Sequence, residues 1–317
     1  MTDTQNEVFK TPVNKIRLFE HGAPGSQNLK LTRKYYTEDM PDGRVKHIVQ
    51  NITDPDIVPY IPDGIGNSTD RQRIPAVLII PGGAFRRLVY NFEGEDVAKW
   101  LNSMGIAAFV LECRLPSDEH DNAEDVPLID AMRAMRVIRG RAQEFGIDEA
   151  KIGVMGFSAG GFMAALLSTA YESDVYVDYK YKDEYDKLSA RPDFAVCSYP
   201  VISIDDCIEA GKRYMSEEQV LERISGSKAK ILHKYNPDKL VRPDMPPVFI
   251  CETDDDRTTL SENSVGFYMA ARKAGVSAEL HIFRTGGHGY GCGDDFAQTG
   301  EWKVLFTKWI KSIGIIS

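Results

Sequence analysis

The run Gly156-Phe157-Ser158-Ala159-Gly160 fits the pattern G-x-S-x-G, in which two glycines flank a serine. A β-prone stretch over 151–157 comes before the serine, and residues with an apolar face at helical spacing follow from Gly160. At such a strand-to-helix turn the glycines allow a sharp bend, and backbone N–H groups at the helix start stabilise negative charge. This context predicts that Ser158 is a nucleophile. An ordinary helix start rich in Gly and Ser is the alternative.

A serine hydroxyl needs a base to remove its proton, so we searched the six histidines of the chain. His288 lies in the glycine-rich run 286–291, directly after the last expected strand, where the carboxyl ends of a parallel sheet assemble their sites. The sequence predicts His288 as the base, and a histidine in a surface loop is the alternative. The other five stand in edge segments, polar stretches or a strand pattern: His21, His47, His120, His233 and His281.

A base of this kind is oriented by a carboxylate, which is expected at the end of the preceding strand. The apolar run Val248 to Cys251 leads into three consecutive acids, Asp254, Asp255 and Asp256. Their mutual repulsion means that at least two of them remain solvated or point apart. From these residues alone the choice stays open. Asp205 and Asp206, after the strand expected over 194–198, are a second location.

Negative charge on a substrate carbonyl oxygen requires fixed donors, and two segments offer backbone N–H groups. One is Ala159, next to the serine. The other is Pro81 to Phe85, where Gly83 and Ala84 are small enough for close backbone approach. An ordinary glycine turn is the alternative for this second segment. Nearby Arg86, Arg87 and Glu93 are interpreted as solvated surface charges.

The elements needed to position these residues follow from residue 76 onward, where β-prone apolar runs alternate with amphipathic runs. This alternation predicts an α/β fold with a doubly wound, mostly parallel sheet covered on both faces. We expect strands over 76–80, 106–111, 151–155, 194–198, 248–251 and 278–283. We expect helices over 95–104, 127–145, 160–171, 216–224, 261–274 and 301–311.

Two short strands expected before residue 76, over 45–49 and 57–61, are predicted to form an antiparallel N-terminal edge of the same sheet. We interpret residues 1–317 as one domain, with edge strands and loops in 1–75 and a catalytic core in 76–317. The polar stretch over 171–192 is predicted to be a solvated connection, with a lid above the site as the alternative.

The formal net charge of −9 disfavours nucleic acid and anionic membranes as partners. No apolar run reaches the roughly 18 residues of a membrane span, and the stretch over 1–10 lacks the pattern of an export signal. The five cysteines show no metal-type spacing. We therefore expect a cytoplasmic protein that uses neither a metal nor another cofactor. The oligomeric state is not predictable from these features.

The ordered motifs of the chain resemble those of the α/β-hydrolase superfamily, and within it the bacterial acetyl esterases with acetyl xylan esterase-like and feruloyl esterase-like members. The likeness extends over nearly the whole length, in the segments 21–25, 81–85, 93–101, 114–116, 153–161, 189–194, 199–203, 262–264 and 286–289. In the family pattern the catalytic acid stands six residues before the triplet Glu262-Asn263-Ser264, which selects Asp256. The chain departs from that pattern at Ala84, where glycine is usual, and at Arg257, Thr258 and Thr259, where proline and valines are usual.

The resemblance implies a serine carboxylesterase that acts on short-chain esters, with acetyl groups on sugars or xylo-oligosaccharides as the first substrate class. Ser158, His288 and Asp256 would form the catalytic triad, and Gly83, Ala84 and Ala159 the oxyanion hole. The expected partner is thus a small-molecule or oligosaccharide ester substrate. Activity on feruloyl or other aryl esters is the nearest alternative. A hydrolase-fold binding protein without turnover is a second alternative, and a peptidase of the same fold is a third.

Overall fold

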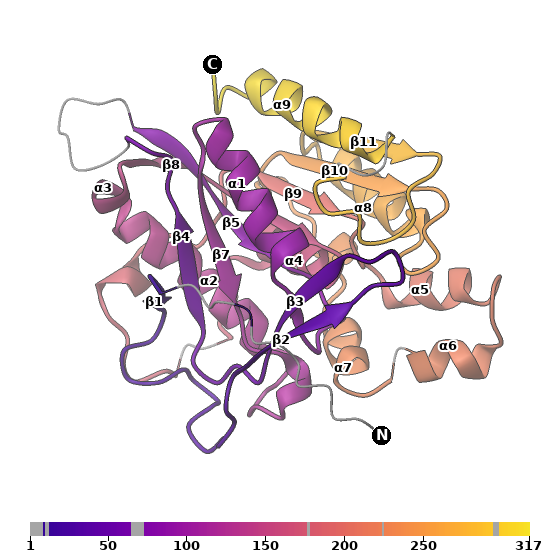
Figure 1. Ribbon diagram of the computed structural model, residues 1–317, viewed down its shortest axis with the longest axis horizontal. Coiled ribbons are helices and arrows are strands. Elements are labelled where there is room, and N and C mark those ends of the chain that lie inside the picture. The colour runs from indigo at the N-terminus through magenta and orange to yellow at the C-terminus, as the bar shows by residue number, and fades with distance from the viewer. Residues whose placement is uncertain (1–8, 10–12, 65–72, 176–177, 224, 294–297) are drawn as a thin grey trace.

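An eight-stranded sheet forms the centre of the molecule (Figure 1). The computed structural model describes residues 9, 13–64, 73–175, 178–223, 225–293 and 298–317. The strand order is β1-β4-β7-β5-β8-β9-β10-β11. The strands from β7 to β11 in this order pair in parallel, whereas β1 and β4 are antiparallel to their neighbours. This confirms the predicted mostly parallel sheet with an antiparallel N-terminal edge. The strands are β1 (Ile16–Arg17), β4 (Asp56–Tyr60), β5 (Ile74–Ile80), β7 (Ala107–Glu112), β8 (Ile147–Phe157), β9 (Ala195–Ser198), β10 (Val248–Thr253) and β11 (Ala278–Phe283).

A second sheet of three strands corrects one expectation. The segment expected at the edge of the main sheet, 45–49, lies in β3 (Val45–Gln50), which pairs with β2 (Lys34–Asp39) and β6 (Leu88–Val89). A tight turn at 40–44 joins β2 to β3, so local hairpin pairing takes β3 away from the main sheet. Because β6 directly follows the segment 81–87, this second sheet supports the loop that carries Gly83 and Ala84.

Helices cover both faces of the main sheet, as the alternating pattern predicts (Figure 1). On one face α1 and α9 lie together, and Trp100 of α1 contacts Trp302 of α9 with ring centroids 4.9 Å apart. On the other face α2 packs against α4. The helices are α1 (Asp96–Ser103), α2 (Val126–Gly140), α3 (Ala142–Phe145), α4 (Ala159–Ala170), α5 (Ile204–Gly211), α6 (Glu217–Arg223), α7 (Ser227–Lys234), α8 (Ser261–Lys273) and α9 (Trp302–Ser312).

The helix expected over 127–145 is in fact two helices, because α2 ends at Gly140 and α3 begins at Ala142. At Gly140 the ring of Tyr185 approaches the backbone so closely that a Cβ there would lie 2.4 Å from it. Glycine also lowers helix propensity, so the break falls where a side chain from another segment packs. Helices α5 and α7, of eight residues each, were not predicted from the sequence.

The buried apolar side chains between Leu18 and Ile315 form a continuous cluster around the main sheet. Cys113, Cys197 and Cys251 belong to this cluster, and none of the five cysteines forms a disulfide. The longest described helix, α2, has 15 residues, and no helix in the described ranges combines the length and hydropathy of a membrane span. The stretch over 1–10, in which the sequence shows no export-signal pattern, lies outside the described residues except for Phe9.

Candidate active site

Ser158 occupies the turn between β8 and α4, with φ 54° and ψ −119°, a conformation that is rare for a residue with a side chain. Close backbone packing holds this turn. A Cβ at Gly156 would lie 1.9 Å from the carbonyl oxygen of Gly160, and a Cβ at Gly160 would lie 1.9 Å from that of Ile80. Only glycine fits at either position. The Ser158 N–H donates to the Ser198 carbonyl at 3.0 Å, which ties the turn to β9.

His288 lies between Ser158 and Asp256. Its Nε2 is 2.9 Å from the Ser158 Oγ, and its Nδ1 is 2.6 Å from the Asp256 Oδ2. The carboxylate fixes the ring with Nδ1–H toward Asp256, so Nε2 is free to accept the serine proton. Ser158 is 130 positions from His288 along the chain, and Asp256 is 32 positions from it. The three predicted residues nevertheless meet in one hydrogen-bonded row at the carboxyl ends of β8 and β10. This arrangement can activate a serine oxygen.

The three consecutive acids after β10 take different positions. Asp256 is 1% exposed and faces His288, whereas Asp254 and Asp255 are exposed. Asp255 accepts a hydrogen bond from the Gly287 N–H at 2.8 Å and so anchors the loop that carries the histidine. Of the second location, Asp205 pairs with Lys239 at 3.2 Å, and the side chain of Asp206 is outside the described ones. Among the described acids, Asp256 is the one hydrogen-bonded to His288.

Asp256 remains ionised because its hydrogen bonds outweigh its burial. Burial acts to raise the pKa of Asp256, but the hydrogen bond and charge of His288 and the N–H groups of Thr258 and Thr259 hold that pKa below its usual value. These two N–H groups donate to Oδ1 at 2.6 and 3.0 Å. The turn after the acid thus provides the donors that keep the carboxylate charged beside the imidazole.

The segment after β5 runs directly beside Ser158. A Cβ at Gly82 would lie 2.9 Å from the Cβ of Ser158. Gly83, Ala84 and Phe85 all have positive φ, at 137°, 58° and 61°. Within the described residues no protein acceptor takes the N–H of Gly83 or Ala84. Ala159 stands at the first position of α4, where an N–H has no acceptor within the helix. These are the unpaired donors that an oxyanion site requires.

The interpretation of Arg86, Arg87 and Glu93 as solvated surface charges is wrong for Glu93. Arg86 is exposed, and Arg87 pairs with Glu38. Glu93 instead is 5% exposed and accepts hydrogen bonds from Gly82 and Tyr199. Glu93 lies in a short turn of π-helix over Asn91–Glu95, and Tyr199 is 106 positions away along the chain, so no local sequence signal indicated its burial.

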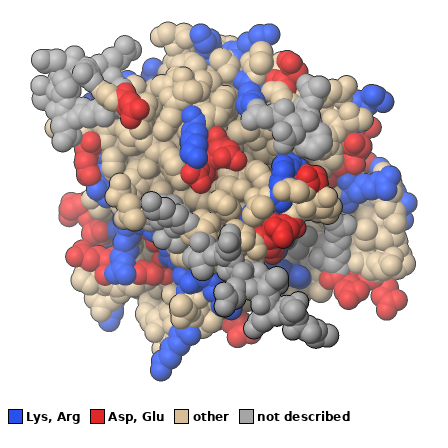
Figure 2. Space-filling view, viewed as in Figure 1, with Lys and Arg blue, Asp and Glu red and all other residues tan. Residues whose placement is uncertain are grey.

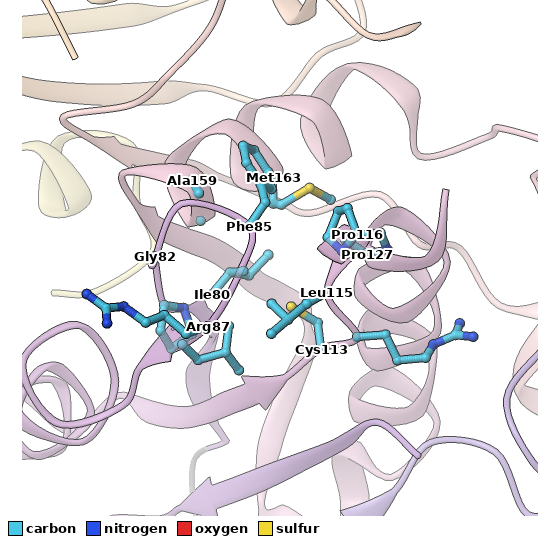
Figure 3. Close-up of a pocket in the computed structure, with 14 residues that line it drawn as sticks. Ile80, Gly82, Phe85, Arg87, Cys113, Leu115, Pro116, Pro127, Ala159 and Met163 are labelled. Carbon is cyan, nitrogen blue, oxygen red and sulfur yellow. The ribbon is translucent and has the colours of Figure 1, made fainter. Parts of the chain in front are cut away.

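An apolar pocket adjoins Ala159, between the segment after β5 and the start of α4 (Figure 3). Phe85 and Met163 line one side of this pocket, and Leu115, Pro116 and Pro127 line the other. The centre of a water-sized sphere can occupy about 10 Å³ of this pocket. A volume of this size holds one water-sized or methyl-sized group.

The segment over 171–192 contacts the N-terminal part of the chain. The Tyr179 hydroxyl donates to the Gly22 carbonyl at 2.8 Å, and Arg133 of α2 pairs with both Asp183 and Asp186. These contacts attach the segment, outside residues 176–177, to the rest of the described chain, and the solvated connection expected from the sequence remains a prediction.

Within the described ranges, no group of three or more His, Cys, Asp or Glu side chains is arranged to hold a metal ion.

Comparison with known proteins relates this chain to ester hydrolases that share one fold. The model of the BD-FAE family matches residues 65–270, so the chain belongs to the BD-FAE family. An acetyl ester-xyloside bifunctional hydrolase from Caldicellulosiruptor lactoaceticus superposes with a TM-score of 0.72 and 35% identity, over 96% of this chain and 97% of that structure. The carboxylesterase Cest-2923 from Lactobacillus plantarum WCFS1 gives a TM-score of 0.66 at 21% identity, over 90% and 99% of the two chains. The fold is the α/β-hydrolase fold.

An acetylxylan esterase of Xylanibacter ruminicola is 31% identical over 240 residues, which cover 75% of this chain. The chain spans 45% and 34% of the lengths of the two curated relatives that it matches, so these relatives are much longer proteins.

Proposed function

We propose that this protein is a serine carboxylesterase that removes short acyl groups, first of all acetyl groups, from sugars or xylo-oligosaccharides. The observation that carries the proposal is the row of Ser158, His288 and Asp256, with its two contacts of 2.9 and 2.6 Å. The names of the relatives support the substrate class. One is an acetylxylan esterase, and another is an acetyl ester-xyloside hydrolase.

In the proposed reaction the Ser158 Oγ attacks the ester carbonyl carbon while His288 Nε2 takes the hydroxyl proton. Asp256 stabilises the imidazolium that forms. The N–H groups of Gly83, Ala84 and Ala159 bind the negative oxygen of the tetrahedral intermediate. The intermediate then collapses, the alcohol leaves with the proton from His288, and an acyl-enzyme remains. Water, deprotonated by His288, attacks the acyl-enzyme and releases the acid.

The small pocket beside Ala159 supports a short acyl group. Its room for about one water-sized or methyl-sized group suits an acetyl methyl, whereas a feruloyl ring would require displacement of Phe85 or Met163. We therefore place acetyl esters ahead of feruloyl and other aryl esters.

The test is a substrate panel with wild type and Ser158→Ala side by side. Acetylated xylo-oligosaccharides, feruloyl esters and p-nitrophenyl esters of increasing chain length are compared by kcat/KM, with labelling of the protein by a fluorophosphonate probe. We expect the highest kcat/KM on acetyl esters, and a loss of roughly 10⁴-fold or more with complete loss of labelling in Ser158→Ala. A wild type that is neither labelled nor active on any ester would favour the non-catalytic binding protein.

The proposed base also makes activity depend on pH. Since His288 must be neutral to accept a proton, kcat/KM should fall as the solution becomes acidic. A profile that stays flat down to pH of about 4 would contradict the role of His288.

A further inference from the structure

Glu93 is a buried carboxylate beside the candidate active site. The Gly82 N–H donates to its Oε2 at 2.8 Å, and the Tyr199 hydroxyl donates to its Oε1 at 3.0 Å. Within the described residues no lysine or arginine forms an ion pair with it. Ionising a buried carboxylate without an ion-pair partner is costly, so a buried glutamate at this position requires an explanation.

Tyr199 connects Glu93 to the loop that carries His288. Its hydroxyl accepts a hydrogen bond from the Gly291 N–H at 3.1 Å, so its own hydrogen is directed to Glu93. Its ring packs against the His288 ring with centroids 5.0 Å apart. Tyr199 is fully buried and has a φ of 37°, which is rare for a residue with a side chain. A continuous path therefore runs from Gly82 through Glu93 and Tyr199 to Gly291.

This path connects two segments whose relative position must be fixed for the proposed reaction. Gly82 immediately precedes Gly83 and Ala84, whose N–H groups are proposed to bind the oxyanion. Gly291 follows His288 by three positions in the same loop. Displacement of either segment by about 1 Å would weaken transition-state contacts strongly.

The charge of Glu93 also acts on the imidazole. Burial holds the pKa of Glu93 above its usual value, although the positive form of His288 and the hydrogen bonds from Tyr199 and Gly82 each act to lower it and so favour the ionised carboxylate. His288 is hydrogen-bonded to Asp256 and packs against the ring of Tyr199, and the charges of both His288 and Lys46 act to lower the pKa of Glu93. The imidazolium formed during catalysis is thus the main positive charge available to Glu93.

We propose that Glu93 is a positioning residue for the proposed esterase reaction: it fixes the oxyanion segment through Gly82, fixes the His288 loop through Tyr199, and stabilises the imidazolium by its charge. This inference rests on the proposed function. It assigns Glu93 no contact with substrate.

The decisive variant is Glu93→Gln. Glutamine has one acceptor atom where two donors must be satisfied, and it carries no charge. With p-nitrophenyl acetate as substrate we expect kcat to fall roughly 10- to 100-fold while KM changes by less than about threefold. We also expect the acid limb of kcat/KM to move to lower pH, because removal of a negative charge makes the imidazole harder to protonate. Glu93→Asp, which keeps the charge, should restore the position of the acid limb.

Glu112→Gln is the matched control, because Glu112 is an equally buried glutamate that binds Lys15 and Arg33 outside the triad. It should lower the thermal stability and leave kcat and the acid limb of a folded sample unchanged. If Glu93→Gln does not fold, Tyr199→Phe decides, since it keeps the ring and removes only the hydroxyl. We expect a fall of roughly tenfold in kcat for this variant.

The possible failures are distinguishable. A folded Glu93→Gln or Tyr199→Phe with wild-type kcat and an unmoved acid limb overturns the role of Glu93 and leaves the esterase intact. If Glu93→Gln lowers kcat but leaves the acid limb in place, and Glu93→Asp does not restore kcat, Glu93 has only a structural role. That result also overturns the proposal. A wild type without fluorophosphonate labelling at Ser158 and without hydrolysis overturns the proposed function and this inference together.

Discussion

The hydroxyl of Thr259 lies within reach of both the acid and the imidazole. Its Oγ1 is 3.0 Å from the Asp256 Oδ2, 3.1 Å from the His288 Nδ1 and 3.1 Å from the Tyr199 carbonyl oxygen. A hydroxyl has one hydrogen, so it donates to one of these oxygens at a time. The departure from valine at this position, noted from the sequence, therefore places a polar group inside the proposed triad and supports the ionised state of Asp256.

Thr259→Val removes this hydroxyl with little change in volume. We predict a fall in kcat of roughly tenfold, which corresponds to about 1.4 kcal/mol, with KM unchanged because Thr259 is placed behind the acid. The measurement is steady-state kinetics on p-nitrophenyl acetate. Thr169→Val is the control, since it removes an equally buried hydroxyl that bonds only within α4. Equal effects of the two variants would argue against a role of Thr259 in the triad.

At the level of elements, the site depends on where strands end and on how closely neighbouring segments approach. The end of β5 lies against the start of α4, so the turn at Ser158 and the segment over 81–85 share one packed interface. The second sheet adds support, because the Val89 N–H donates to the Gly82 carbonyl at 2.9 Å and the Tyr90 N–H to that of His47 at 2.8 Å. The oxyanion segment is therefore held from both sides.

Gly160→Ala tests this close approach. The added Cβ would lie 1.9 Å from the Ile80 carbonyl oxygen, so the backbone must shift. We predict a loss of more than about 3 kcal/mol in the free energy of unfolding, measured by urea denaturation, or no folded protein. Gly105→Ala is the control, because its surroundings are open and only its positive φ opposes a side chain; about 1 kcal/mol is expected there. A Gly160→Ala protein as stable as wild type would contradict the packing.

Over the whole molecule, a buried charge cluster joins Lys15 and Arg33 to the edge of the main sheet. Asp56 of β4 stands directly opposite Glu112 of β7, and Arg33 bridges them at 2.7 and 2.6 Å, with Lys15 2.7 Å from Glu112. On the face in Figure 2, described acidic and basic side chains are interspersed. The continuous buried cluster supports residues 1–317 as one domain, which remains a prediction, as do the cytoplasmic location and the absence of nucleic-acid binding.

This cluster makes stability depend on pH. Burial and the neighbouring Glu112 raise the pKa of Asp56 to about 6. Above the unfolded pKa of about 4 the folded state then binds more protons than the unfolded state, so the contribution of Asp56 decreases as pH rises toward 6. We predict that the free energy of unfolding of wild type minus that of Asp56→Asn falls by about 2 kcal/mol between pH of about 4 and 7. Urea denaturation across this range measures the difference. A difference that rises with pH would reverse the inferred shift.

The sequence by itself determined the succession of strands and helices along most of the chain, the turn at Ser158 and the glycine-rich loop of His288. Each of these depends on local signals: apolar periodicity, strand length and the freedom of glycine in tight turns. Only the tertiary structure decided which of three adjacent aspartates turns inward, that Glu93 is buried, and that β3 leaves the main sheet. The first two outcomes depend on partners far along the chain, His288 for Asp256 and Tyr199 for Glu93, which no local pattern contains, whereas β3 pairs with the neighbouring β2 instead of the sheet edge.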